Sequence, residues 1–346
     1  MHIEKMLEMA VKMGATDMFL VPGSSMKLKT KRGMTKLTDE RIMPERSEEL
    51  IRQIYDIAGR NIESLLKTGD DDFSFSIPAV GRFSCSAYRQ RNSLAAVIRI
   101  INFGLPRSED LHIPEEIMNL WDVKSGLIIV TGPAGSGKTT AEACLVDRIN
   151  AEREGHIITL EDPIEHIHRH KKSLVSQREI GHDTESYLHA LRSAVRQTPD
   201  VILLGEMRGY DAINTALTAA ETGQLVITTL HIAGAANSIK RIVDGFPAAQ
   251  HAQIRLQLSM VLRAIISQQL IPTKDGTLQP VFELLVVTPA VQSIIREGNL
   301  DELDEMTVIG MDADIKRLYE AGEITKDTAL AYAMDYDKME RELLDS

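Results

Sequence analysis

One eight-residue segment, 132–139 (GPAGSGKT), limits the possible folds of this chain more than any other feature. It matches the pattern G-x-x-x-x-G-K-[ST] without a mismatch, follows an apolar run at 127–130 and precedes a helix-forming run at 140–154. Glycines let such a loop fold its N–H groups around phosphate oxygens, and the positive end of the following helix faces the same anion. An ordinary glycine-rich turn would need neither the lysine nor the threonine. The segment therefore predicts a phosphate-binding loop between a strand and a helix.

We expect two polar side chains of this loop to have different roles in nucleotide binding. The Lys138 ammonium would reach the β- and γ-phosphates of a nucleotide, and the Thr139 hydroxyl would hold Mg²⁺. We expect the nucleotide to be bound by Gly132, Gly135, Ser136, Gly137, Lys138, Thr139 and Thr140.

Three further apolar runs follow the loop, and helical segments separate them; the runs lie at 156–160, 201–204 and 225–229. This alternation predicts right-handed crossovers in a mostly parallel α/β sheet. In such sheets ligands bind beyond the carboxyl ends of the strands. The residues directly after each run are therefore the candidates for chemistry.

The second run is followed by an acidic segment, 161–166 (EDPIEH). Next to a phosphate loop, one of its carboxylates could orient and deprotonate an attacking water. The alternative is a solvated acidic turn nucleated by Asp162-Pro163. The position at a strand end favours the catalytic interpretation.

The third and fourth runs end in a carboxylate and a histidine. Glu206 follows Gly205, which stands where an aspartate is common, and its oxygens suit the shell of a hard cation such as Mg²⁺. His231 could hydrogen-bond the γ-phosphate or the nucleophilic water. A lone histidine at a sheet edge is more often structural, so its role depends on the neighbouring motifs.

Three alternating histidines, His166, His168 and His170, would share one face of an extended segment. A metal site is conceivable there, but no cysteine or carboxylate is obviously placed to complete it. A solvated basic loop is the simpler interpretation.

The chain of 346 residues is long enough for two domains. The periodicity up to residue 102 predicts a small α+β domain with helices at 3–13, 45–58 and 61–67 and strands at 17–21, 26–30, 72–77, 82–88 and 95–101. Gly and Pro predict a linker at 103–111, so the second domain would span 112–346. Its last part predicts a helix at 249–268, a strand at 280–287, a helix at 291–297, and two charged helices over 312–344 that join at Gly322.

Composition excludes several kinds of protein. A formal net charge of -11 argues against a protein that coats DNA, so we expect no nucleic-acid partner. No apolar run approaches the length of a membrane span and the first residues do not resemble a signal peptide, so we expect a cytoplasmic protein. The two cysteines, Cys85 and Cys144, lie in apolar patterns and should be buried. They are too few for a four-cysteine zinc module.

Together, these segments resemble the secretion ATPase superfamily of type II secretion and type IV pili, and within it the PilT-type pilus retraction ATPases. The resemblance spans residues 1 to about 300. It rests on 161–166 as the Asp box, 201–208 (VILLGEMR) as the Walker B segment and 225–231 (LVITTLH) as the His box. It implies a PAS-like N-terminal domain and a RecA-like P-loop ATPase domain, assembled as a homo-hexamer that uses ATP and Mg²⁺.

The same resemblance implies roles for single residues. Glu165 would be the general base, Glu206 would stand near Mg²⁺, and His231 would be the His-box residue. Arg82 and Arg99 lie where the N-terminal domain of the family supplies arginines to nucleotide, in the same subunit or across a subunit boundary.

Two features predict a motor for pilus retraction. Assembly and secretion ATPases of the superfamily usually carry the zinc module that this chain cannot build, and residues 290–297 (AVQSIIRE) partly match the AIRNLIRE motif of retraction ATPases. The expected partner is an inner-membrane pilus platform protein, through which the chain would contact the cytoplasmic face of the membrane. The alternatives are an assembly or secretion ATPase, or a regulatory scaffold that binds nucleotide with little hydrolysis.

Overall fold

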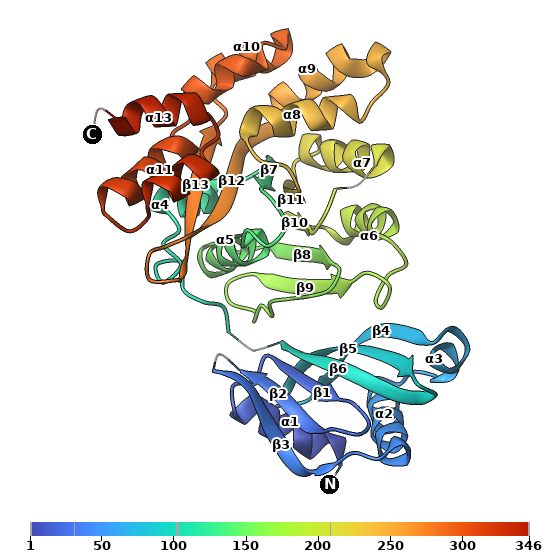
Figure 1. Cartoon of the computed structure of the whole chain (residues 1–346). Coiled ribbons are helices and arrows are strands. Elements are labelled where there is room, and N and C mark those ends of the chain that lie inside the picture. Colours follow the sequence, from blue (N-terminus) through green and yellow to red (C-terminus); the bar gives the residue numbers. More distant parts are fainter. Residues whose placement is uncertain (1, 31, 102–103, 208, 345–346) are drawn as a thin grey trace. The chain divides into compact units, whose positions relative to one another are not determined.

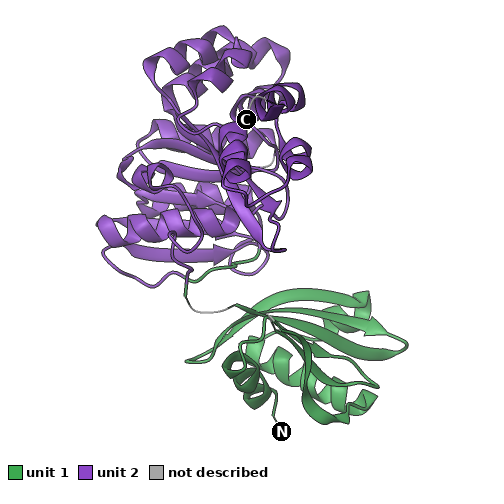
Figure 2. Cartoon of the chain, turned by 60° about the vertical axis from the view of Figure 1, so that its left-hand side comes forward, with its two compact units in different colours: residues 1–104, 163–167 green, residues 105–162, 168–346 purple. Residues whose placement is uncertain are grey.

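The computed structural model describes residues 2–30, 32–101, 104–207 and 209–344. It divides the chain into two compact units (Figure 2). Unit 1 comprises residues 1–104 together with the short segment 163–167, and unit 2 comprises 105–162 and 168–346. Residue 102, the last of the predicted first domain, residue 103, the first of the predicted linker, and Arg208 of the Walker B segment lie outside the described residues.

Unit 1 is built on an antiparallel six-stranded sheet in the order β3-β2-β1-β6-β5-β4 (Figure 1). Its elements are α1 (Ile3–Lys12), β1 (Asp17–Leu20), β2 (Ser25–Thr30), β3 (Gly33–Arg41), α2 (Pro44–Ala58), α3 (Glu63–Thr68), β4 (Asp70–Ile77), β5 (Gly81–Gln90) and β6 (Ser93–Ile101). Apolar residues of the three helices and of one sheet face form a single core. Along β5, Phe83, Cys85 and Ala87 are buried while their neighbours are not, as the alternation predicts.

Unit 2 contains a seven-stranded sheet in the order β13-β12-β7-β11-β10-β8-β9, parallel except for β13. The strands are β7 (Gly126–Thr131), β8 (His156–Glu161), β9 (Leu174–Glu179), β10 (Val201–Leu204), β11 (Leu225–Leu230), β12 (Leu262–Pro272) and β13 (Leu278–Val286). The helices are α4 (Glu115–Met118), α5 (Lys138–Glu152), α6 (Tyr187–Ala194), α7 (Tyr210–Glu221), α8 (Ala235–Asp244), α9 (His251–Val261), α10 (Pro289–Glu297), α11 (Met311–Glu320), α12 (Lys326–Tyr332) and α13 (Tyr336–Leu344), with 3-10 turns η1 (Asn119–Asp122), η2 (Val195–Gln197), η3 (Ala248–Gln250) and η4 (Leu300–Met306).

Alternate residues of the parallel strands enter two separate cores, one on each face of this sheet. Ile128 and Val130 of β7 pack with α4 and α5. Leu127 and Ile129 of the same strand pack with α6, α7, α8, α9 and α10. Because both faces are covered, the strands read as continuous apolar runs, which is why β7, β10 and β11 were predictable.

The predicted helix at 249–268 is wrong beyond Val261. The chain there enters β12 without a loop, and β12 lies between β7 and β13. A strand buried on both faces has no period of two, so its apolar residues also fit a helix. The tertiary pairing decides the outcome.

The predicted pair of C-terminal helices is also wrong, because this region forms α11, α12 and α13. The extra break follows Tyr332. There, the Asp312 carboxylate accepts hydrogen bonds from the N–H groups of Met334 (2.7 Å) and Asp335 (3.0 Å). These two backbone groups are thereby satisfied without a continuous helix.

Both cysteines are buried, as predicted. Burial raises the pKa of the Cys85 thiol to about 12 and that of Cys144 to about 11. No helix within the described part of the chain is both long and apolar enough to span a bilayer.

Candidate nucleotide-binding site

The predicted phosphate loop connects β7 to α5, the arrangement expected from the motif. The backbone φ angles of Gly132, Gly135 and Gly137 are 144°, 77° and 88°, which L-residues other than glycine rarely adopt. Gly137 is the residue directly before α5, so the helix begins at Lys138. The loop conformation therefore depends on glycine at these positions.

Lys138 lies inside the loop, with a side chain that is 5% exposed. Its ammonium donates hydrogen bonds to the carbonyl oxygens of Gly132 (2.9 Å) and Pro133 (2.8 Å). Burial lowers the pKa of Lys138, and the charges of Glu142 and Glu206 oppose this effect. The two carboxylates thus help to keep the lysine protonated in a desolvated place.

The hydroxyl residues of the loop differ in exposure. Thr139 is exposed and Thr140 half-buried, both in the first turn of α5. Ser136 is 2% exposed, and its buried hydroxyl has no hydrogen-bond partner among the described residues. Thr139 therefore offers an accessible oxygen at the start of the helix, where a hard cation beside phosphates would find one.

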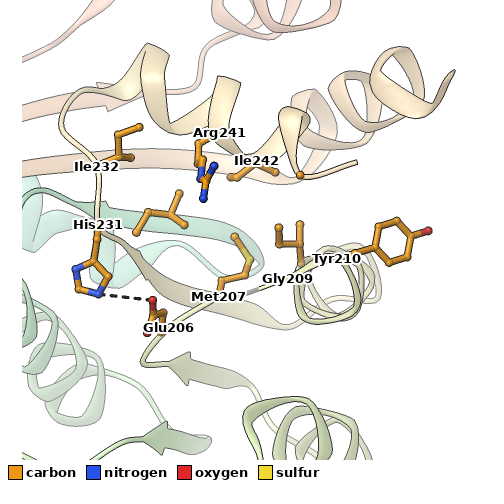
Figure 3. A pocket seen from close by; sticks show the side chains of 11 residues that line it. Glu206, Met207, Gly209, Tyr210, His231, Ile232, Arg241 and Ile242 are labelled. Carbon is orange, nitrogen blue, oxygen red and sulfur yellow. Dashed lines mark ion pairs between the residues drawn. The ribbon is translucent and has the colours of Figure 1, made fainter. Parts of the chain in front are cut away.

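Glu206 and His231 are brought together at the carboxyl edge of the sheet (Figure 3). They follow β10 and β11, which pair in parallel with Leu204 opposite Thr228. The Glu206 carboxylate lies 3.7 Å from His231 Nε2, and the side chains are 20% and 47% exposed. The two predicted strand ends therefore form one polar pair that solvent can reach.

Gly205 has little space for a side chain. A Cβ at this position would lie 3.1 Å from both the Leu160 carbonyl oxygen and the Tyr187 hydroxyl. An aspartate there would crowd β8 and α6. Glu206 is consequently the carboxylate that this strand end presents.

The acidic segment after β8 separates into different environments. Glu161 is 7% exposed and accepts hydrogen bonds from Thr159 Oγ1 (2.6 Å) and Gln177 Nε2 (3.1 Å), so it stabilises the β8–β9 edge. Glu165 is exposed and lies in 163–167, which belongs to unit 1. Glu165 and Glu206 therefore belong to different units.

Arg82 and Arg99 share one face of the unit 1 sheet. Arg99 of β6 lies opposite Ser84 of β5, two residues after Arg82, and opposed residues of antiparallel strands point to the same side. Arg99 is 72% exposed and pairs with Asp17 at 3.3 Å. The two arginines are therefore diagonal neighbours on this face, where Arg99 is exposed and Arg82 is half-buried.

The three alternating histidines do not converge. His168 is buried and His170 accepts a hydrogen bond from the Val175 N–H through Nδ1 (3.0 Å). Among the described residues, no group of three or more His, Cys, Asp or Glu side chains could hold a metal ion.

Two residues near the loop were not predicted. Glu142, one helical turn after Lys138, is 3% exposed and accepts a hydrogen bond from Thr229 Oγ1 at 2.8 Å. Gln268 of β12 lies against the loop, because a Cβ on Gly132 would overlap its carbonyl oxygen. Glu142 interrupts the otherwise apolar run 141–146 (AEACLV), which is a recognisable signal, whereas Gln268 fell within the mistaken helix.

The segment after His231 is held by buried polar contacts. Thr131 Oγ1 donates to the Ile232 carbonyl oxygen, and Ser267 Oγ accepts from the Gly234 N–H at 3.1 Å. Glu283 accepts from the Ala235 N–H at 2.7 Å, at the start of α8. These contacts fix the backbone that carries His231.

Glu283 leads to a prediction about pH. Its burial raises the pKa of this carboxyl above the ordinary 4.5, so the charged form is disfavoured in the folded protein. Between 4.5 and the raised pKa the folded state binds more protons than the unfolded state, and stability falls as pH rises. We expect Glu283→Gln, which keeps the acceptor, to gain stability over wild type as the pH increases from 5 to 7.

Urea unfolding of both proteins at several pH values measures this difference. Glu283→Ala is the control, because it removes the acceptor for the Ala235 N–H and should be about 1–3 kcal/mol less stable than the Gln variant. If the free energy of unfolding of Glu283→Gln changes with pH as that of wild type does, Glu283 is not the source of the pH dependence.

A phosphate loop after an interior strand of a mostly parallel sheet, with a carboxylate at a neighbouring strand end, defines a P-loop nucleotide-binding protein. Residues 87–280 match the model of the type II/IV secretion system protein family. The chain is 38% identical over 341 residues to the type IV pilus ATPase PilU of Pseudomonas aeruginosa, covering 96% of this chain and 89% of that protein. It is also 38% identical over 340 residues to the type IV pilus retraction ATPase PilT of the same organism, covering 95% and 97%.

Among solved structures, the pilus retraction motor PilT with bound ADP matches with a TM-score of 0.90 and 40% identity, over 99% of both chains. The chain belongs to the type II/IV secretion system protein family, as a PilT-type secretion ATPase. The expected family and the α/β fold class with its largely parallel sheet are thereby confirmed.

Proposed function

We propose that this chain is a hexameric ATP-hydrolysing motor that powers type IV pilus retraction by removing pilin subunits. The observation that carries the proposal is its similarity, along almost the whole chain, to the pilus retraction motor PilT. The partial match of 290–297 to the retraction motif and the presence of only two cysteines support the same direction.

In this proposal, ATP binds the loop from Gly132 to Thr140, and Lys138 contacts its β- and γ-phosphates. The Thr139 hydroxyl and the Glu206 carboxylate are the oxygen donors that suit Mg²⁺, which would neutralise charge on the phosphates when bound. His231, 3.7 Å from Glu206, would orient the attacking water or contact the γ-phosphate. Glu165 would accept the proton of that water.

The remaining parts of the proposal concern assembly. A PAS-like domain (1–102), a linker (103–111) and a RecA-like domain with a helical C-terminal region (112–346) would form each subunit of a ring. Arg82 and Arg99 share one face of the unit 1 sheet, from which they would reach nucleotide in the same or an adjacent subunit. The ring would work at the cytoplasmic face of the inner membrane through a pilus platform protein, without nucleic acid.

A deletion strain complemented with wild type or with Glu206→Gln tests the function. Retraction predicts that the deletion and the Gln variant both accumulate surface pili and lose twitching, while wild type restores it. Loss of all surface pili in the deletion strain would instead support an assembly motor. Wild-type twitching with the Gln variant would contradict an ATP-driven role for this chain.

A further inference from the structure

A cavity of about 700 Å³ opens beside the Glu206–His231 pair (Figure 3). Its apolar walls include Ile213, Leu230 and Ile242, which belong to the core that covers the sheet with α7 and α8. The phosphate-loop helix α5 packs in the core of the opposite face. Glu206 also influences Lys138 electrostatically, so this carboxylate adjoins both the loop and the cavity.

Arg241 of α8 brings a positive charge to this cavity. Its guanidinium group points into the space between Ile232, Ile242 and Met207 (Figure 3). Within the described parts of the chain, it forms no hydrogen bond or ion pair. A guanidinium group with free donors beside apolar walls is well suited to bind an oxyanion.

We propose that this cavity receives the inorganic phosphate produced by ATP hydrolysis and that Arg241 binds it before it leaves. This inference rests on the proposed ATPase reaction: the water oxygen bonds to the γ-phosphorus as the bond to the bridging oxygen breaks, giving ADP, HPO₄²⁻ and a proton. The product forms beside Glu206 and His231, and the cavity is lined by the same two residues. ADP on the phosphate loop would meanwhile block the other side.

The charges that line this route favour movement of the phosphate from Glu206 toward Arg241. Glu206, whose carboxylate lies 3.7 Å from His231 Nε2, repels the dianion. Arg241, on the α8 wall, attracts the same ion. The phosphate would thus move from a site with a carboxylate to a site with a guanidinium group.

The test compares the chemical step with phosphate release in the full-length protein. Rapid-quench measurement gives the rate of ATP cleavage, and a fluorescent phosphate-binding protein gives the rate of release. We expect Arg241→Gln to slow release about tenfold, the effect of losing one charge-assisted contact, while cleavage stays near the wild-type rate. Arg241→Lys should restore part of the release rate.

Lys240→Gln is the matched control, because Lys240 is the preceding residue of α8, is exposed, and lines a different cavity. It should release phosphate at the wild-type rate. Added inorganic phosphate should inhibit wild type more strongly than Arg241→Gln, with Lys240→Gln resembling wild type.

Equal release rates in wild type and Arg241→Gln, with normal cleavage, would overturn this inference alone. A change of oligomeric state in Arg241→Gln would also overturn it, because Arg241 would then belong to a subunit interface. Absence of cleavage in wild type would overturn the proposed function first and this inference with it.

Discussion

Replacement of Glu206 by Gln should lower the kcat for ATP hydrolysis by about 100-fold or more and leave the Kd for ATP nearly unchanged. Gln has the shape of Glu, so the packing at the end of β10 is kept. It lacks the charge that stands 3.7 Å from His231 and beside Lys138. Steady-state phosphate production and calorimetric ATP binding measure the two quantities.

Glu161→Gln is the control for this prediction, because Glu161 also ends a strand of the same sheet but is buried against Thr159 and Gln177. Its replacement should change stability more than kcat. If Glu206→Gln hydrolyses ATP like wild type, Glu206 is not a catalytic residue.

The second large effect is expected for Gly132→Ala, which should destabilise the protein by about 2–5 kcal/mol and abolish nucleotide binding. Gly132 has a φ of 144°, and an added Cβ would overlap the Gln268 carbonyl oxygen and lie 2.9 Å from Ser136 Oγ. The loop would have to move away from β12 to admit the methyl group. Urea unfolding and ADP titration of the variant report the two losses.

Gly135→Ala separates crowding from backbone strain. Gly135 has a φ of 77°, but an added Cβ would have no heavy atom within 4 Å. This variant should lose only about 1–2 kcal/mol and remain folded. If Gly132→Ala and Gly135→Ala lose the same amount of stability, crowding against β12 is not the reason that residue 132 must be glycine.

The unit 2 strands predicted from sequence are those with strong local signals. β7, β10 and β11 are apolar runs buried on both faces, and the loop motif fixed the position of the first. β3 of unit 1 and β9 of unit 2 had no such signal. β3 is exposed or half-exposed along its whole length, and β9 is an edge strand in which Val175 is buried but Leu174 is exposed, so neither shows an apolar run.

The positions of candidate site residues were predictable where they follow directly from the order of the strands. Glu206 and His231 end adjacent parallel strands, and parallel strands end at the same edge. Glu142 and Gln268 depend on which faces meet in three dimensions, and no local pattern encodes that. The catalytic and binding roles of all these residues remain predictions, and Glu165, Arg82 and Arg99 differ from Glu206 and His231 in that they belong to unit 1.

β12 joins two parts of unit 2 that are far apart in sequence. Gln268 lies against the phosphate loop, and Ile271, three residues later, belongs to the core of α11, α12 and α13. A densely packed strand transmits displacement along its length. The C-terminal helices thus pack against the same strand that borders the phosphate loop, so we expect substitutions in their core to change the stability of the loop.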